Sequence, residues 1–201
     1  MKNSLIILAF FSTGLILGIS KKLPDLILQN DFSMYALYVL MLLVGISIGA
    51  DRNAWTVLRT KKIKIFLIPL GVVAGTLAGT GMASLFLPDL KLNEVLAVGS
   101  GFGYYSLSSL LITEIHSKAL GVTALLSNIL REIMTLLITP LLVQYFGKLA
   151  GIGAGGATSM DTTLPVITRY SGKEWGIISV FSGVVLTLLV PFLVTFFLKV
   201  V

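Results

Sequence analysis

GVTALLSNILREIMTLLITPLLVQ, residues 121–144, is an almost continuous apolar run. A helix of about 20 such residues crosses the roughly 30 Å hydrocarbon core of a bilayer. Four further runs have the same character, at 5–20, 32–50, 66–87 and 175–198. The sequence therefore predicts about five helices that cross a membrane fully.

The composition of the whole chain agrees with this prediction. Of its 201 residues 56% are hydrophobic and 12% charged, and the mean hydropathy is +0.98. Soluble domains are about 45–50% apolar and roughly 25% charged, so a water-soluble enzyme is excluded. The chain has no cysteine and one histidine, His116, so we expect no thiolate or multi-histidine metal site and no cofactor. We expect one transmembrane domain over 1–201.

Two further segments, 94–111 and 150–168, are apolar but interrupted. The first contains the run Gly99 to Ser109, GSGFGYYSLSS, and the second the run Gly155 to Pro165, GGATSMDTTLP. Glycine and proline disfavour a continuous helix, and irregular backbone inside a membrane is tolerated only within protein or beside water. The predicted fold is an all-α integral membrane protein with about five full spans and two broken or re-entrant segments that line a cavity.

The basic residues indicate how the chain is oriented. The densest basic loop, 52–64, carries a net excess of Arg and Lys, which the positive-inside rule places in the cytoplasm. The net charge of +6 is therefore interpreted as membrane topology, and not as nucleic-acid binding. The N-terminus is then inside and the C-terminus outside, in a prokaryotic inner membrane. Only the loop around His116, which we expect to be solvated, changes side between crossing and re-entrant segments.

The 121–144 span contains two charged residues, Arg131 and Glu132, and an amide, Asn128, close before them. Charged groups at this depth are rare and usually functional. Asn128 and Glu132 are four residues apart and share a helix face, whereas Arg131 is rotated by about 100° and needs another partner. Two interpretations stay open. One is a structural Arg and Glu tied to neighbouring helices, and the other is the polar wall of a transport cavity with Glu132 as a cation or proton site.

Asp161 is the strongest candidate for a functional residue. It is an isolated carboxylate within the second interrupted segment, where unwound backbone and hydroxyls offer a binding site near the midplane, as in secondary transporters. The other candidate substrate- or proton-binding residues are Thr158, Ser159, Thr162 and Thr163 in the same segment, and Gly101, Gly103, Tyr104, Tyr105 and Ser106 in the first one.

A glycine stripe marks the 66–87 span. Gly71, Gly75 and Gly79 recur every four residues, the spacing that lets membrane helices approach closely. We expect this face to pack against a neighbouring helix.

The motifs at Ser100–Ser108, at Asn128 with Arg131 and Glu132, and at Gly156–Pro165 resemble those of the LysO family of prokaryotic lysine exporters. The resemblance covers nearly the whole chain. It implies export of L-lysine, and of analogues such as thialysine, against inward proton movement. It also implies an essential intramembrane acid, a role that falls on Asp161. A proton and an ammonium compete for one buried carboxylate, which would give antiport.

Long members of this family carry an additional upstream portion with further membrane helices and another acidic residue. We therefore expect a separately encoded small membrane protein or a homo-oligomer to replace it. Two alternatives stay open: an exporter of another small amino acid or organic ion, and a nontransporting scaffold subunit. An intramembrane enzyme is disfavoured because the chain has no cysteine and its one histidine lies in a loop without an evident nucleophile.

Overall fold

The computed structural model describes residues 63–199 and a few separate positions between 13 and 50. By contacts between residues the chain divides into two units, 1–36 and 37–201, and the helices below belong to the second. The predicted spans 5–20 and 32–50 and most of the basic loop lie outside the described residues. The prediction of one domain over 1–201 stays a prediction.

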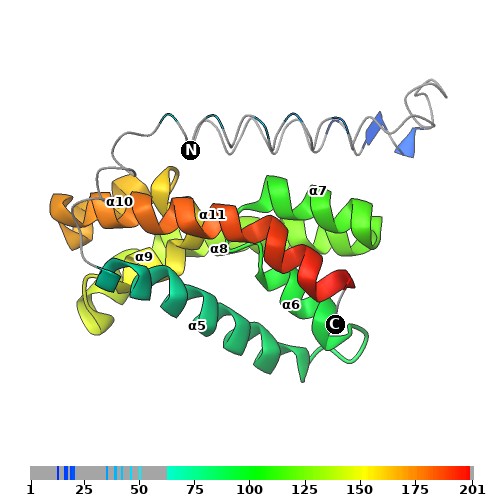
Figure 1. The fold of residues 1–201 in the computed structure, drawn as a ribbon, viewed down its shortest axis with the longest axis horizontal. Helices are drawn as coiled ribbons and strands as arrows, with labels where there is room; N and C mark the ends of the chain where they lie inside the picture. The colour runs from blue at the N-terminus through cyan, green and yellow to red at the C-terminus, as the bar shows by residue number, and fades with distance from the viewer. Residues whose placement is uncertain are drawn as a thin grey trace. The chain divides into compact units, whose positions relative to one another are not determined.

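The described residues form helices and no strand (Figure 1). In chain order these helices are η1 (Ile63–Phe66), α5 (Leu67–Ser84), α6 (Leu92–Gly99), α7 (Tyr105–Ile115), α8 (Lys118–Phe146), α9 (Ala150–Gly155), η2 (Gly156–Met160), α10 (Leu164–Ser171), η3 (Lys173–Trp175) and α11 (Gly176–Lys199).

Three of these helices, α5, α8 and α11, are long and apolar enough to cross a membrane. They coincide with the predicted spans 66–87, 121–144 and 175–198, which confirms those three spans by length and composition. α8 begins earlier than its apolar run because the Ser117 hydroxyl caps it, accepting a hydrogen bond of 3.3 Å from the Leu120 N–H. Its 29 residues correspond to about 43 Å of helix.

The first interrupted segment folds back on itself. α6 runs into the bundle, the helix is interrupted at 100–104, and α7 runs back, so that it ends beside the start of α6. The ends meet where His116 Nε2 lies 3.0 Å from Glu94 Oε1. His116, expected to be solvated, thus joins the base of this hairpin, which we call hairpin 1 (92–116).

The second interrupted segment, hairpin 2 (148–171), also folds back on itself, and it enters the bundle from the end opposite to that of hairpin 1. α9, η2 and α10 follow one another, and the Ser171 hydroxyl donates a 2.8 Å hydrogen bond to the Lys148 carbonyl. Both predicted breaks are confirmed, and of the two arrangements left open by the sequence, the contacts agree with re-entrant hairpins. Figure 1 shows hairpin 1 at one end of α8 and hairpin 2 at the other.

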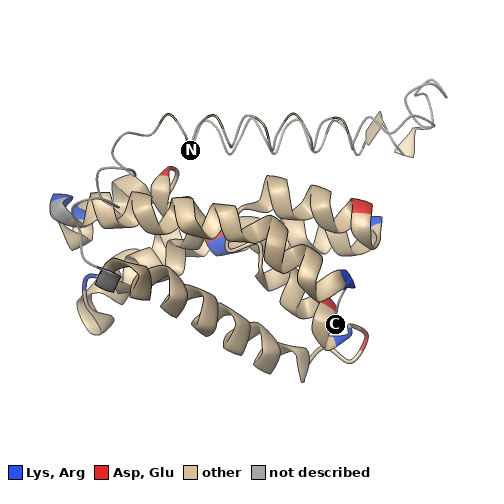
Figure 2. Cartoon of the chain, in the orientation of Figure 1, with Lys and Arg blue, Asp and Glu red and all other residues tan. Residues whose placement is uncertain are grey.

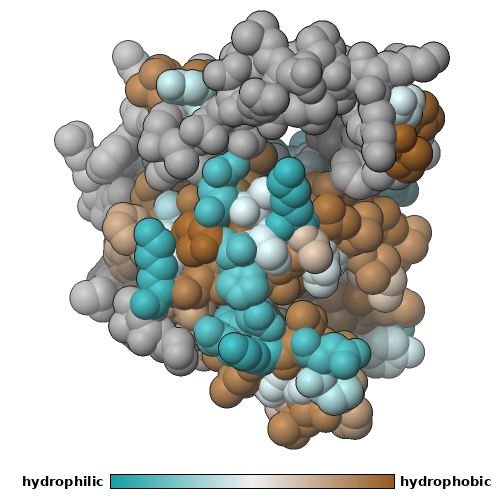
Figure 3. Space-filling view, turned by 90° about the vertical axis from the view of Figure 1, so that its right-hand side faces the viewer, coloured by the Kyte–Doolittle hydropathy of each residue, from teal (hydrophilic) through white to brown (hydrophobic). Residues whose placement is uncertain are grey.

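The buried core lies where α7, α8 and α11 meet the break of hairpin 1. Phe102, Ile112 and Leu186 are fully buried there. Large apolar side chains also cover the outside, among them Phe86 and Leu137, as expected where lipid is the solvent. Charged residues gather instead at the two ends of the helices (Figure 2). Figure 3 views the end that holds the base of hairpin 1 and shows hydrophilic side chains gathered among apolar ones.

The glycine stripe of α5 has no close neighbour among the described helices, and its packing against another helix stays a prediction. A Cβ added at Gly71, Gly75 or Gly79 would meet no atom within 4 Å. No described helix therefore packs closely on this face. Part of it, at Gly71 and Gly75, lines a groove instead.

Candidate functional site

The breaks of the two hairpins meet in the middle of the bundle. The backbone is left-handed at Phe102 (φ 49°) and Gly103 (φ 95°) in hairpin 1 and at Gly156 (φ 60°) in hairpin 2. The Ala157 N–H donates a 2.8 Å hydrogen bond to the Phe102 carbonyl, joining one break to the other. A Cβ at Gly156 would collide with that carbonyl, so this crossing requires glycine.

Asn128 on α8 fixes the break of hairpin 1. Its Oδ1 accepts a 2.7 Å hydrogen bond from the Gly103 N–H, and its Nδ2 donates to the carbonyls of Val98 and Ala124 at 3.2 and 2.9 Å. Gly101 lies so close that an added Cβ would be 2.6 Å from Nδ2. The Asn128 amide is thus occupied by protein backbone, which makes it a positioning residue.

Arg131 on α8 fixes hairpin 2. Its Nε and Nη2 donate to the carbonyls of Ala154 and Gly153 at 3.0 and 3.1 Å, and its Nη1 donates to Thr76 Oγ1 at 3.2 Å. These carbonyls lie at the C-terminal end of α9, where a cation is favourable. The expectation that Arg131 finds a partner away from Glu132 is confirmed. The Glu132 carboxylate forms no ion pair with it in the described part of the chain.

Glu132, Asp161, Thr162, Tyr104 and Tyr105 lie together beside the hairpin tips, and we call them the acidic cluster. Glu132 and Asp161 interact electrostatically, Tyr105 interacts with both, and Glu132 lies within hydrogen-bonding range of the Thr162 side chain. Two carboxylates that the sequence places 29 positions apart are thus brought to one site.

The two carboxylates differ in exposure. Glu132 is buried, with 5% of its surface exposed. Asp161 lies at the break of hairpin 2, as predicted, but its side chain is exposed. Its Oδ1 accepts hydrogen bonds from the Thr162 N–H at 2.6 Å and the Thr162 hydroxyl at 3.3 Å. Water and solutes therefore reach Asp161 more readily than Glu132.

Most of the other predicted hydroxyl groups form hydrogen bonds with backbone carbonyls. Thr158, Ser159 and Thr163 are buried, and each donates to a carbonyl of its own hairpin at 2.7 to 3.0 Å. Ser159 and Ser179 of α11 also donate to each other's carbonyls at 3.0 and 2.7 Å, so hairpin 2 is fastened to α11. Ser106 lies in the first turn of α7 beside Tyr104.

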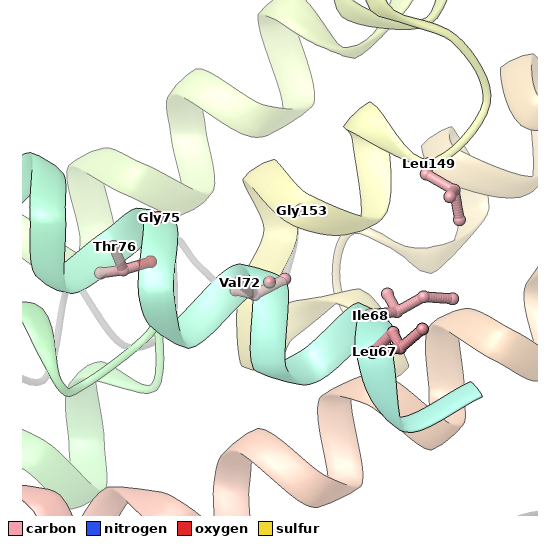
Figure 4. A pocket seen from close by; sticks show the side chains of 8 residues that line it. Leu67, Ile68, Val72, Gly75, Thr76, Leu149 and Gly153 are labelled. Carbon is pink, nitrogen blue, oxygen red and sulfur yellow. The ribbon is translucent and has the colours of Figure 1, made fainter. Parts of the chain in front are cut away.

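A groove of about 540 Å³ lies between α5 and α9 (Figure 4). Thr76 and Gly153, the partners of the Arg131 guanidinium, both line it. Thr76 was missed by the sequence reasoning because a hydroxyl in a glycine-rich span carries no local signal of its partner 55 residues away. No group of His, Asp or Glu side chains suited to a metal ion occurs among the described residues.

Comparison with known proteins identifies the family. The family model described as "Lysine exporter LysO" matches residues 8–198. The chain is 36% identical over 172 residues to "Lysine exporter LysO" of Escherichia coli K12, a match covering 84% of this chain and 55% of that protein. It is 34% identical over 170 residues to the "Putative lysine exporter" of Haemophilus influenzae, covering 84% of this chain and 85% of that one.

The chain therefore spans about half the length of the E. coli relative. No solved structure matches it. The family model covers nearly every residue, and both relatives exceed 30% identity, which confirms the resemblance carried by the hairpin motifs. With three helices able to cross a membrane, this multi-pass chain belongs to the lysine exporter LysO family.

Proposed function

We propose that this chain exports L-lysine, and close analogues such as thialysine, from the cytoplasm in exchange for protons. The observation that carries the proposal is the meeting of two hairpin tips beside the acidic cluster. Discontinuous helices that meet near the midplane form the substrate sites of many secondary transporters. The family match supports lysine as the substrate.

The site offers a partner for each charge of lysine. Its two ammonium groups suit the carboxylates of Asp161 and Glu132. The first N–H groups of α7, which begins at Tyr105 beside the cluster, have no partner within the helix and form its positive end, which suits the α-carboxylate. Tyr104, Tyr105, Ser106 and Thr162 add hydroxyls around these charges.

Exchange follows from the chemistry of the carboxylates. A carboxylate that holds a proton has lost the charge that attracts an ammonium, so proton and lysine exclude each other at the same oxygen atoms. Export of lysine then draws on the inward proton gradient. Because the hairpins enter from opposite ends, movements of the two against α8 and α11 would expose the cluster to each side in turn.

The charges at the two ends support an orientation with hairpin 2 at the cytoplasmic side. The sequence at its end of the bundle carries three basic residues, Lys148, Arg169 and Lys173, and one acidic residue, Glu174, whereas the end of hairpin 1 has equal numbers of acidic and basic groups (Figure 2). The positive-inside rule then places the C-terminus outside. The mixed groups are Lys91, Lys118 and Lys199 with Asp89, Glu94 and Glu114.

This orientation is measurable because the chain contains no cysteine. Lys118→Cys and Lys173→Cys place single thiols at opposite ends. A membrane-impermeant maleimide added to intact cells is expected to label the first, and the second only after the membrane is opened. The reverse pattern would contradict the orientation.

The function is tested with purified protein in lipid vesicles loaded with radiolabelled lysine. We expect lysine efflux that accelerates when a proton gradient is imposed in the exchanging direction, and that unlabelled lysine inhibits far more strongly than alanine. Efflux of alanine at the same rate would point to a different substrate. If the protein neither binds nor releases any amino acid, a nontransporting scaffold is the interpretation that remains.

The same assay tests the proposed partner. We propose that the chain works together with a second copy of itself or with a separately encoded small membrane protein. Efflux by vesicles holding only this chain, at a lipid dilution that leaves one copy per vesicle, would contradict that proposal.

A further inference from the structure

Arg131 carries a positive charge that no carboxylate of the described residues neutralises. Within the described residues its guanidinium forms no ion pair, and its partners are two carbonyls and one hydroxyl. A guanidinium has five N–H donors, and three are used in these bonds. Two N–H groups therefore remain without a partner in this part of the chain.

The guanidinium stands between the groove and the hairpin tips. On one side it binds Thr76 and Gly153, which line the groove. On the other it reaches the crossing, where a Cβ at Gly156 would lie 3.0 Å from Nη2. No residue that lines the groove is charged, and the Arg131 guanidinium is bonded directly to two of its lining residues, Thr76 and Gly153.

The two neighbours Arg131 and Glu132 face different sides of α8. Glu132 belongs to the acidic cluster, whereas Arg131 points to α9 and α5. The positive charge of Arg131 thus lies on the side of α8 that faces the groove, and the carboxylate of Glu132 lies on another side. The groove adjoins the start of α9, the end proposed to be cytoplasmic.

We propose that Arg131 selects for a carboxylate on the transported molecule, so that lysine passes while diamines and small inorganic cations are rejected. The proposal rests on the lysine export proposed above. In a medium of low polarity an unpaired cation repels other cations strongly, and a fixed arginine excludes cations from other membrane pores in this way. On its way to the acidic cluster, lysine presents its α-carboxylate to the two free N–H groups of Arg131, and a charge-assisted pair replaces the repulsion.

The decisive probe is 1,5-diaminopentane, which is lysine without its carboxylate and keeps both ammonium groups. In vesicles holding the wild-type chain, lysine efflux is expected to exceed diaminopentane efflux by about ten- to a hundredfold, the ratio expected when one charge-assisted pair is lost. If the wild-type chain transports both compounds at similar rates, the proposed role of Arg131 is wrong, but the proposal of lysine export is unaffected. A chain that carries neither overturns both proposals.

Substitutions of Arg131 distinguish a role in selecting the substrate from a purely structural role. Arg131→Lys keeps the charge and is expected to keep the lysine preference, whereas Arg131→Gln is expected to reduce the ratio of lysine to diaminopentane efflux by at least about tenfold. A structural role would lower both rates together and leave the ratio unchanged. Lys118→Gln removes a positive charge at the start of α8, away from the groove, and is the matched control with an unchanged ratio. A wild type that carries both compounds at similar rates overturns the proposal even if Arg131→Gln does not fold.

Discussion

Asp161→Asn is expected to remove lysine export while leaving the fold intact. Asparagine has nearly the shape of aspartate, and its Oδ1 still accepts the 2.6 Å hydrogen bond from the Thr162 N–H. Only the charge is lost. Hydrogen bonds to charged groups contribute about 1.5 to 3 kcal/mol, so lysine binding is expected to weaken roughly ten- to a hundredfold. The measurement is lysine efflux from vesicles, with resistance to thialysine in an exporter-deficient cell as the test in vivo.

The matched control is Asp89→Asn. Asp89 is also exposed, but it lies in the connection between α5 and α6, away from the acidic cluster. Its replacement removes the same charge and is expected to change neither efflux nor resistance. Wild-type resistance from Asp161→Asn, at equal amounts of protein in the membrane, would remove Asp161 from the mechanism.

Glu132→Gln is expected to uncouple export from the proton gradient. Glu132 is buried beside Asp161, Thr162 and Tyr105, and glutamine keeps its volume but cannot release a proton. We expect lysine efflux to fall about tenfold and to respond weakly to an imposed proton gradient. The measurement is the ratio of efflux rates with and without the gradient, for the wild type and for the variant.

Glu114→Gln serves as its control, because Glu114 lies at the far end of α7. The gradient ratio of this variant is expected to equal that of the wild type. If Glu132→Gln retains both export and its gradient dependence, Glu132 is a structural residue. The geometry already removes one structural explanation, since Arg131 is held by carbonyls of α9 instead of by this carboxylate.

Local composition was sufficient to predict three of the spans and both breaks. The apolar runs that form α5, α8 and α11 were recognisable because a helix that crosses the hydrocarbon core needs a long uninterrupted series of apolar residues. The breaks at Phe102 and Gly156 lie in the runs of glycine and hydroxyl residues that disfavour a helix. The same reasoning found Asp161 and Glu132, because charges in apolar surroundings stand out in a sequence.

Contacts between distant residues were beyond the reach of the sequence. The bonds of Arg131 join it to residues 22 to 55 positions away, and no local pattern specifies them. The return of each segment to its own end became evident only from the Glu94–His116 and Lys148–Ser171 contacts. The exposure of Asp161 depends on what packs around it and was not predicted.

The backbone bond between Ala157 and Phe102 has a mechanical implication. It ties together two elements that are inserted from opposite surfaces, so a shift of either one along the bundle axis must lengthen this bond or drag its counterpart along. Conformations in which both elements have withdrawn at once forfeit the bond and leave an N–H and a carbonyl without partners in a nonaqueous interior. That penalty acts against a continuous open conduit, which is the state that would dissipate the ion gradient of the cell.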